Sequence, residues 1–470
     1  MKQKSNARSL GVFSLAMMNC AAVISLKNLP AMAEYGLSMV FFYAISIFTF
    51  LIPTALVSAE LATGFPEEGG MFNWVNKALG NRWGFLAVWL NFISNAVSFP
   101  VALTYMASLI AYASNATHLA SNNYYVFAVV FFTTWIGTWV ALKGMRLASV
   151  VTNVGSILGT LIPGSIVIVL GITWILAGHE SFTPITTSAL FPKLDSVDQA
   201  VFFLNVLLGF AGLELSAYHA QDVGNPQRDY PRSIFISTLL IFSISILGSL
   251  AIAVSVPKEV LTLESGVIQA IESLFNKFGM SYLTRLIAWL MVIGAIAWFV
   301  AWVAGPARGM LATAHTGTLP RSLQKINSNG MPSIIIIWQA VIVTFFALLF
   351  LFVDSVTTCF WMLLAITTQL ILVMYVLMFI SGIILRFKYP DAPRAYKVPG
   401  GNAGMISICI VAIAVCVFCY FIGFVPPEEL HFANKTQYAL LMIFGNVLIT
   451  LPPFIIYRFR KPEWKSDLSE

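Results

Sequence analysis

Long apolar runs set the strongest limit on what this chain can fold into. A helix needs about 20 mostly apolar residues to cross a bilayer, and about twelve such segments follow one another with short polar connections. They lie near 10–33, 39–62, 84–113, 124–142, 148–177, 199–220, 233–255, 284–313, 333–353, 356–386, 404–424 and 437–457. The strands of membrane barrels are only about ten residues long. The runs therefore predict an all-α polytopic membrane protein with about 12 transmembrane helices.

The charge distribution predicts how these helices are oriented. Only 10% of the residues are charged, against about a quarter in soluble domains. Twenty of the 26 basic residues lie at one set of helix ends: Lys2, Lys4, Arg8, Lys77, Arg82, Lys143, Arg146, Arg228, Arg232, Arg308, Arg321, Lys325, Arg386, Lys388, Arg394, Lys397, Arg458, Arg460, Lys461 and Lys465. Because Lys and Arg gather in cytoplasmic loops, both termini and every second connection are expected in the cytoplasm. The excess of basic residues, a net charge of +6, is then expected to face the cytoplasmic surface of the bilayer. No nucleic-acid partner is expected.

Signatures of catalysis and of metal binding are missing from the sequence. The five cysteines stand alone within apolar runs, with neither metal-ligand spacing nor a disulfide framework. There is no HExxH, no Gly-x-Ser-x-Gly and no pair of intramembrane aspartates. We therefore expect no cofactor, and a membrane-embedded enzyme is less favoured than a transporter. A channel would need rings of charge or a filter repeat, and it is less favoured too.

Two apolar segments are interrupted near their middle. The first, "SLAMMNCAAVISLKNLPAMAE", carries small and polar residues and then Lys27, and the sixth holds Phe210-Ala211-Gly212 followed by Glu214. Broken helices in corresponding positions of two halves are typical of the binding sites of transporters. Their ends present free N–H and C=O groups, which suit a carboxylate and an ammonium. An amino acid carries both, although small residues also serve close helix packing.

Several ordered motifs resemble the amino acid–polyamine–organocation superfamily. They are "SAELATGFPEEGG", "LGTLIPG", "FAGLELSAYHAQDVGNPQRDYP", "WVAGPARGMLATAHTGTLP" and "RAYKVPGG", and together they extend over nearly the whole chain. The "EEGG", "NPQRDYP" and "GPARGM" portions resemble its glutamate/γ-aminobutyrate antiporter branch. This resemblance implies an inverted five-plus-five helix repeat with broken helices 1 and 6, two further C-terminal helices, and transport by alternating access.

The same resemblance implies which residues bind the substrate. In the family, the first and sixth helices are unwound at positions that match 23–25 and 210–213 of this chain. Polar positions of its third helix match Asn91 and Asn95, and aromatic positions of its eighth and tenth helices match Trp302 and Tyr375. The implied substrate-binding residues are Val23, Ile24, Ser25, Asn91, Asn95, Phe210, Ala211, Gly212, Trp302 and Tyr375. For the asparagines, contacts between helices are the alternative to a cavity role. For Trp302, ordinary packing is the alternative to stacking on the substrate.

Three residues are candidates for proton coupling or gating: Glu214, Lys27 and His219. Glu214 is expected either as a proton carrier, gate hinge or partner of the substrate amine, or as a structural acid. Lys27 either pairs with Glu214 across the two breaks or extends toward the membrane interface. His219 either tunes proton linkage or makes a hydrogen bond at a helix end. The acids Glu60, Glu67 and Glu68 are expected to form a cytoplasmic charge network with Arg228, Arg232 and Arg308.

One transmembrane domain is expected over residues 1–470, with a first repeat at about 10–177, a second at about 199–386 and extra helices at about 404–457. The favoured function is an amino acid antiporter of the bacterial inner membrane. The resemblance implies that it exchanges an amino acid for its decarboxylated amine, in the manner of glutamate and γ-aminobutyrate. A proton-coupled amino acid symporter is the alternative, so protons are candidate coupling ions. The sequence predicts no oligomeric state.

Overall fold

A computed structural model describes most of the chain. The described residues are 10–67, 69–192, 203–204, 206–207, 209–215, 218, 223–257, 265–352, 356–426 and 435–465. Within them every regular element is a helix, and the only β contact is an isolated parallel bridge between Leu10 and Val223. The predicted all-α polytopic fold is confirmed.

The helices of the first part of the chain precede residue 193. They are α1 (Val12–Val23), α2 (Leu29–Ala33), α3 (Met39–Ser46), α4 (Ile52–Gly64), α5 (Met71–Leu79), α6 (Asn81–Ala113), α7 (Asn123–Leu142), α8 (Met145–Ser156) and α9 (Ile162–Leu176). Short π-helical turns join α3 to α4 at Ile47–Leu51 and α8 to α9 at Ile157–Leu161.

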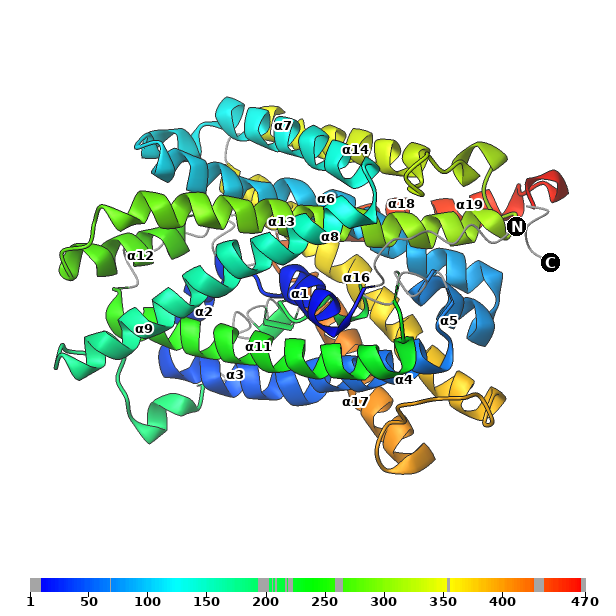
Figure 1. Cartoon of the computed structure of the whole chain (residues 1–470), viewed down its shortest axis with the longest axis horizontal. Helices are drawn as coiled ribbons and strands as arrows, with labels where there is room; N and C mark the ends of the chain where they lie inside the picture. Colours follow the sequence, from blue (N-terminus) through cyan, green and yellow to red (C-terminus); the bar gives the residue numbers. More distant parts are fainter. Residues whose placement is uncertain are drawn as a thin grey trace.

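The remaining helices begin after residue 223. They are α11 (Pro226–Ser255), α12 (Gly266–Lys277), α13 (Leu283–His315), α14 (Ser333–Ala347), α15 (Leu349–Phe352), α16 (Val356–Lys388), α17 (Gly401–Ile422), α18 (Lys435–Thr450) and α19 (Pro452–Arg458). Figure 1 shows α1 in the middle of the bundle, and it packs there against α8, α11 and α13.

Eleven helical stretches are long and apolar enough to cross a membrane among the described residues. They are Val12–Ala33, Gly36–Gly64, Asn81–Ala113, Asn123–Leu142, Met145–Leu176, Pro226–Ser255, Leu283–His315, Ser333–Phe352, Met362–Lys388, Gly401–Ile422 and Lys435–Arg458. Each corresponds to one of the expected segments. The one remaining expected segment, the sixth at 199–220, lies partly outside the described residues, and its described part belongs to the candidate site.

The π-helical turn at Ile157–Leu161 lies at a close crossing of two transmembrane segments. Pro163 has no N–H to give to the carbonyl of Gly159 four residues earlier, which favours a local change of helical pitch. Gly159 packs directly on Gly294 of α13, and a Cβ added to Gly159 would lie 2.1 Å from the nitrogen of Gly294. Only the absence of both side chains permits this crossing.

Gly159→Ala is therefore expected to destabilise the bundle. The new methyl group would meet backbone atoms of α13 that cannot rotate away, and overpacking of this kind costs about 1–3 kcal/mol. The measurement is the melting temperature of the purified protein in detergent. Gly445→Ala in α18 is the matched control, because its Cβ would make only an ordinary contact at 3.4 Å with Ile366. Equal melting temperatures for the two variants would contradict this packing argument.

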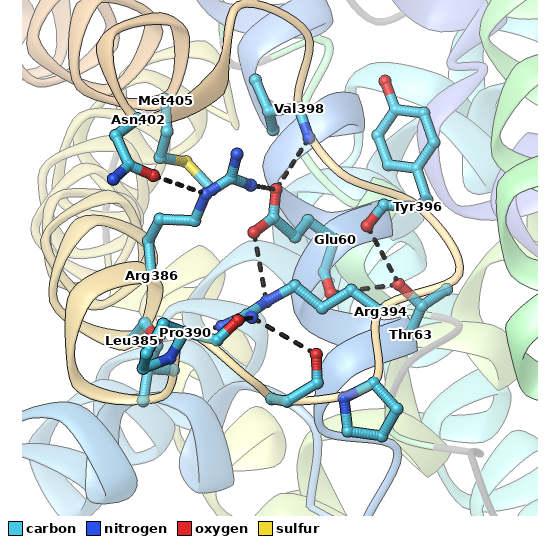
Figure 2. Close-up of polar contacts among 12 residues, drawn as sticks. Glu60, Thr63, Leu385, Arg386, Pro390, Arg394, Tyr396, Val398, Asn402 and Met405 are labelled. Atoms are coloured by element: carbon cyan, nitrogen blue, oxygen red, sulfur yellow. Dashed lines mark hydrogen bonds and ion pairs between the residues drawn. The ribbon is translucent and has the colours of Figure 1, made fainter.

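A buried ion-pair cluster ties α4 to α16 and to the connection that follows α16 (Figure 2). The Glu60 carboxylate accepts hydrogen bonds from Arg386 and from the backbone N–H of Val398, the latter at 2.7 Å. Its other oxygen lies 3.2 Å from Nε of Arg394. The side chains of Glu60 and Arg394 are each 1% exposed. One carboxylate thus holds two guanidinium groups.

This cluster corrects the expected partners of Glu60. The sequence placed Glu60 with Arg228, Arg232 and Arg308, but its ion pairs are made with Arg386 and Arg394. The connection after α16 folds back onto the end of α4 and brings Arg394 there, which a reading along the chain could not show. Burial lowers the pKa of Arg394, the Glu60 carboxylate raises it, and neighbouring Arg386 lowers it again. Glu60 is therefore the group that compensates two buried cations.

Candidate functional site

The first transmembrane segment is interrupted where the sequence predicts. Helix α1 ends at Val23, and Ile24 and Ser25 are extended, with ψ of 108° and 97°. The chain then forms a short 3₁₀ turn at Leu26–Asn28 and continues as α2. The last turn of a helix leaves carbonyl groups without intrahelical partners. One of them, that of Ala22, accepts a hydrogen bond from Nε1 of Trp302 at 3.0 Å.

The described part of the sixth segment is also interrupted. Residues 209–212 form a turn, and Gly212 has φ of +122°, a conformation that favours glycine. Its backbone N–H donates to the hydroxyl of Tyr375 at 2.8 Å. That hydroxyl in turn donates to Oε2 of Glu214 at 2.7 Å. Tyr375 therefore satisfies the freed amide of the break, and Glu214 orients Tyr375.

Trp302 of α13 contacts both interruptions. It bonds to Ala22 at the first break. A Cβ added to Gly212 at the second break would lie 2.8 Å from Cζ2 of the indole and 3.2 Å from Val23. The absence of a side chain at Gly212 thus lets the indole approach the sixth segment. One aromatic side chain joins the two broken helices.

A cavity of about 130 Å³ lies between the two interruptions. It is large enough for a small molecule, since a single water needs only about 10–15 Å³ on the same measure. Six of the residues predicted to form the site line it together: Val23, Ser25, Lys27, Asn95, Ala211 and Trp302. They come from α1, the 3₁₀ turn after it, α6, the sixth segment and α13. Residues that are separated by up to 279 positions in the chain thus share one cavity.

The α6 wall of this cavity is rich in hydrogen-bond acceptors. Ser94 and Ser98 donate their hydroxyl protons to the carbonyls of Asn91 and Asn95, at 2.9 and 3.0 Å. The amide nitrogen of Asn95 donates to Asn91, at 2.7 Å to its carbonyl and 2.8 Å to Oδ1. Because these donors bond within α6, the hydroxyl lone pairs and the side-chain oxygen Oδ1 of Asn95 are the groups left for a ligand. This wall suits an ammonium.

Lys27 supplies the charge of the cavity. It is the only charged side chain among the described residues that line it. Its Nζ lies 5.9 Å from the centre of the Trp298 ring, and within the described chain no carboxylate comes within 4 Å of it. Lys27 and Glu214 therefore do not form the ion pair that was one of the two expectations. Lys27 lines both this cavity and a smaller one beside it.

The other predicted site residues lie beside the main cavity. Asn91 is buried one turn away, where its amide donates to the hydroxyl of Tyr218 at 2.9 Å. Ile24 lines a second cavity of about 40 Å³, and Phe210 lines a third of about 10 Å³. Gly212, Glu214 and Tyr375 form the hydrogen-bonded group described above. His219 lies outside the described residues.

Several lining residues were not predicted: Asn28, Ser94, Ser98, Trp298 and Thr367. A signal for the two serines was present, since Asn91, Ser94, Asn95 and Ser98 recur at a spacing of three and four, which places them on one helical face. Trp298 lies four residues before Trp302 and shares its face for the same reason. Thr367 has no such signal. No group of His, Cys, Asp and Glu able to hold a metal occurs in the described part of the chain.

Comparison with known proteins identifies the family of this chain. The family model described as "Amino acid permease" matches residues 10–448. The chain therefore belongs to the amino acid permease family, and its superfamily is the one that its motifs resemble. It is a multi-pass membrane transporter and not an enzyme.

Three similar proteins extend over nearly the whole chain. An uncharacterized transporter of Legionella pneumophila is 39% identical over 446 residues, which are 95% of this chain and 96% of that protein. A glutamate/γ-aminobutyrate antiporter of Lactococcus lactis is 28% identical, over 99% of this chain and 93% of that protein. A probable agmatine/putrescine antiporter of the same species is 23% identical, over 97% and 96%.

Proposed function

We propose that this protein is an amino acid antiporter that works by alternating access. The observation that carries the proposal is the cavity between the two interrupted helices, which has polar groups from α6 and an indole that contacts both breaks. Antiport itself is proposed from similarity to the glutamate/γ-aminobutyrate antiporter. The exchanged pair would be an amino acid and its decarboxylated amine.

The proposed binding mode follows from the distribution of acceptors. The substrate ammonium would meet the C-terminal end of α1, which carries the negative end of the helix dipole, together with Asn95. Val23, Ser25 and Ala211 would contact the substrate through their backbone, and Trp302 would stack over its ammonium and the adjoining carbon chain. The two breaks would be held in place by five residues that lie beside the main cavity: Ile24, Asn91, Phe210, Gly212 and Tyr375.

The placement in the membrane is proposed from the basic residues. Their gathering at one set of helix ends supports cytoplasmic termini and a bacterial inner membrane. Figure 1 places α5, which lies in one of the basic connections, and α12 at opposite ends of the bundle. We further propose two repeats, at about 10–177 and 199–386, in one domain with extra helices at 404–457.

Proton-coupled symport is the second candidate, and Glu214 favours it. This carboxyl group is 1% exposed, and its Oε1 has no hydrogen-bond partner in the described part of the chain. A buried carboxyl with one free oxygen is a suitable site for a proton. Binding of a proton would make Glu214 a weaker acceptor for the hydroxyl of Tyr375. Because that hydroxyl also accepts from Gly212, the change would affect the sixth-segment break.

Transport into proteoliposomes separates the two candidates. An antiporter takes up labelled amino acid only when the vesicles contain unlabelled substrate, whereas a proton symporter fills empty vesicles when a pH gradient is imposed. We expect uptake to depend on internal substrate. Uptake into empty vesicles driven by the gradient would favour the symporter, and the absence of any amino acid flux would contradict both.

Trp302→Ala is expected to weaken apparent substrate affinity about tenfold or more. It removes the stacking surface and the bond to Ala22, and loss of about 1–2 kcal/mol of cation–π attraction has this effect. Trp302→Phe keeps a ring and loses only the N–H, so its affinity should fall less. The measurement is half-saturation of exchange. Trp338→Ala is the control, because Trp338 of α14 is 56% exposed on the bundle surface. Unchanged affinity in both Trp302 variants would assign this indole to packing.

A further inference from the structure

The second cavity adjoins the main one and is lined by two polar side chains that have no hydrogen-bond or ion-pair partner among the described residues. Its volume is about 40 Å³, and it shares Ser25, Lys27 and Trp298 with the main cavity. Lys27 has no carboxylate within 4 Å among the described residues. The Tyr105 hydroxyl, which also belongs to this cavity, is buried and has no hydrogen-bond partner in the described chain. The expected coupling or gating role of Lys27 does not explain why the hydroxyl of Tyr105 lacks a described partner in the same cavity.

These two groups have the same chemical preference. An ammonium can only donate hydrogen bonds, and a tyrosine hydroxyl is a ready donor. Buried polar groups are normally hydrogen-bonded, so two neighbouring donors without acceptors point to an acceptor that a ligand brings. A charged acceptor is the better match, because Lys27 is a cation in a membrane-spanning segment and no described carboxylate lies within 4 Å of it.

The two cavities together therefore have opposite polarity at their ends. Asn95 and Ser98 present acceptors in the main cavity, and Lys27 with Tyr105 presents donors in the second. Tyr105 lies seven residues beyond Ser98 on α6, and its side chain leans back toward the start of the helix. The two ends are thus separated by roughly 5–10 Å, the span of a short carbon chain.

We propose that the second cavity is a carboxylate subsite, in which Lys27 and Tyr105 bind the carboxylate at the far end of the substrate from its amino group. The substrate class is then an amino acid whose ammonium and a carboxylate are several bonds apart: an acidic amino acid or an ω-amino acid. Lys27 selects for this carboxylate and repels diamines. This inference rests on the proposed transport of amino acids and names the class that the site prefers.

The wild-type protein tests the preference without any mutation. Compounds of matched length compete with labelled glutamate for exchange: 4-aminobutyrate carries a distal carboxylate, butylamine carries none, and putrescine carries a second ammonium. We expect competition by 4-aminobutyrate and little by the other two. Glutamine, whose distal group is uncharged, should compete about tenfold less well than glutamate. Equal competition by all four compounds would overturn the subsite.

Variants of the two residues test the assignment. Lys27→Met removes the charge at similar volume, so the apparent affinity for glutamate should fall at least about tenfold while that for glutamine changes little. Lys27→Arg should keep part of the preference for glutamate over glutamine. Tyr105→Phe should reduce the same preference severalfold. Lys143→Met is the control, because Lys143 lies 5.1 Å from the Trp139 ring but does not line either cavity. Equal losses for glutamate and glutamine would make Lys27 structural and overturn the proposal.

The outcomes also separate this inference from the function on which it rests. If the wild type exchanges amino acids but Lys27→Met keeps the preference for glutamate, the subsite is wrong and the antiporter stands. If the wild type neither binds nor exchanges any amino acid, both are wrong.

Discussion

Glu60→Gln is expected to destabilise the protein by about 3–5 kcal/mol, the usual cost of removing one partner of a buried ion pair. The substitution keeps the shape of the side chain but leaves Arg386 and Arg394 as neighbouring buried cations without a compensating charge (Figure 2). Burial already lowers the pKa of Arg394, and Glu60 opposes that change. The measurement is thermal unfolding of the purified protein in detergent.

A surface ion pair of the same end of the bundle provides the control. Glu67 pairs with Lys77, and their side chains are 52% and 31% exposed. Glu67→Gln should therefore cost no more than about 1 kcal/mol, since exposed pairs contribute little. If Glu60→Gln were as mild as Glu67→Gln, the cluster would not be what joins α4 to α16 and its following connection.

Tyr375→Phe is expected to reduce exchange at least about tenfold. One hydroxyl accepts from Gly212 and donates to Glu214, so its loss leaves a buried amide and a buried carboxyl unsatisfied. Each such group costs about 1–3 kcal/mol, and a charged one costs more. The sixth-segment break would lose the contact that holds its backbone open. Initial rates of exchange in proteoliposomes, normalised to folded protein, measure the effect.

Two further variants show whether Tyr375 and Glu214 act together. Glu214→Gln should also reduce exchange strongly, and the double variant should be little worse than either single one, because both remove the same contact. Tyr125→Phe is the control, since it removes one bond to the carbonyl of Ala107 at 2.9 Å, away from the breaks. Additive losses in the double variant would show that the two residues act independently.

Much of the site was predictable because interruptions and membrane charges are rare in apolar runs. Lys27 stands out in its segment for that reason, and it does line the cavity together with Val23, Ser25, Asn95, Ala211 and Trp302. Trp302 and Tyr375, which meet the breaks through single hydrogen bonds, were predicted only from the resemblance to a known family. Thr367 could not be predicted, because one threonine in an apolar helix carries no signal of which neighbour it faces.

Charge pairing was the part that the sequence misassigned. Glu60 was expected with Arg228, Arg232 and Arg308, and one of the two expectations for Lys27 was an ion pair with Glu214. Opposite charges in one chain have many possible partners, and a choice among them depends on distances across the bundle. The structure places Glu60 with Arg386 and Arg394, and Glu214 with Tyr375.

The sequence by itself determined the helices, the membrane as their environment and the places where helices 1 and 6 break. These are local properties: apolar length decides whether a helix crosses a bilayer, and a small or polar stretch weakens it at one point. Only the tertiary structure decided which side chains meet in the cavities and which ions pair. The acceptors of α6 and the polar groups of Lys27 and Tyr105 are local facts of the sequence, but their placement around two adjoining cavities arises from the packing of the first segment, α6 and α13. The close contact of Gly159, in the turn at Ile157–Leu161, with Gly294 of α13 likewise joins residues far apart in the chain.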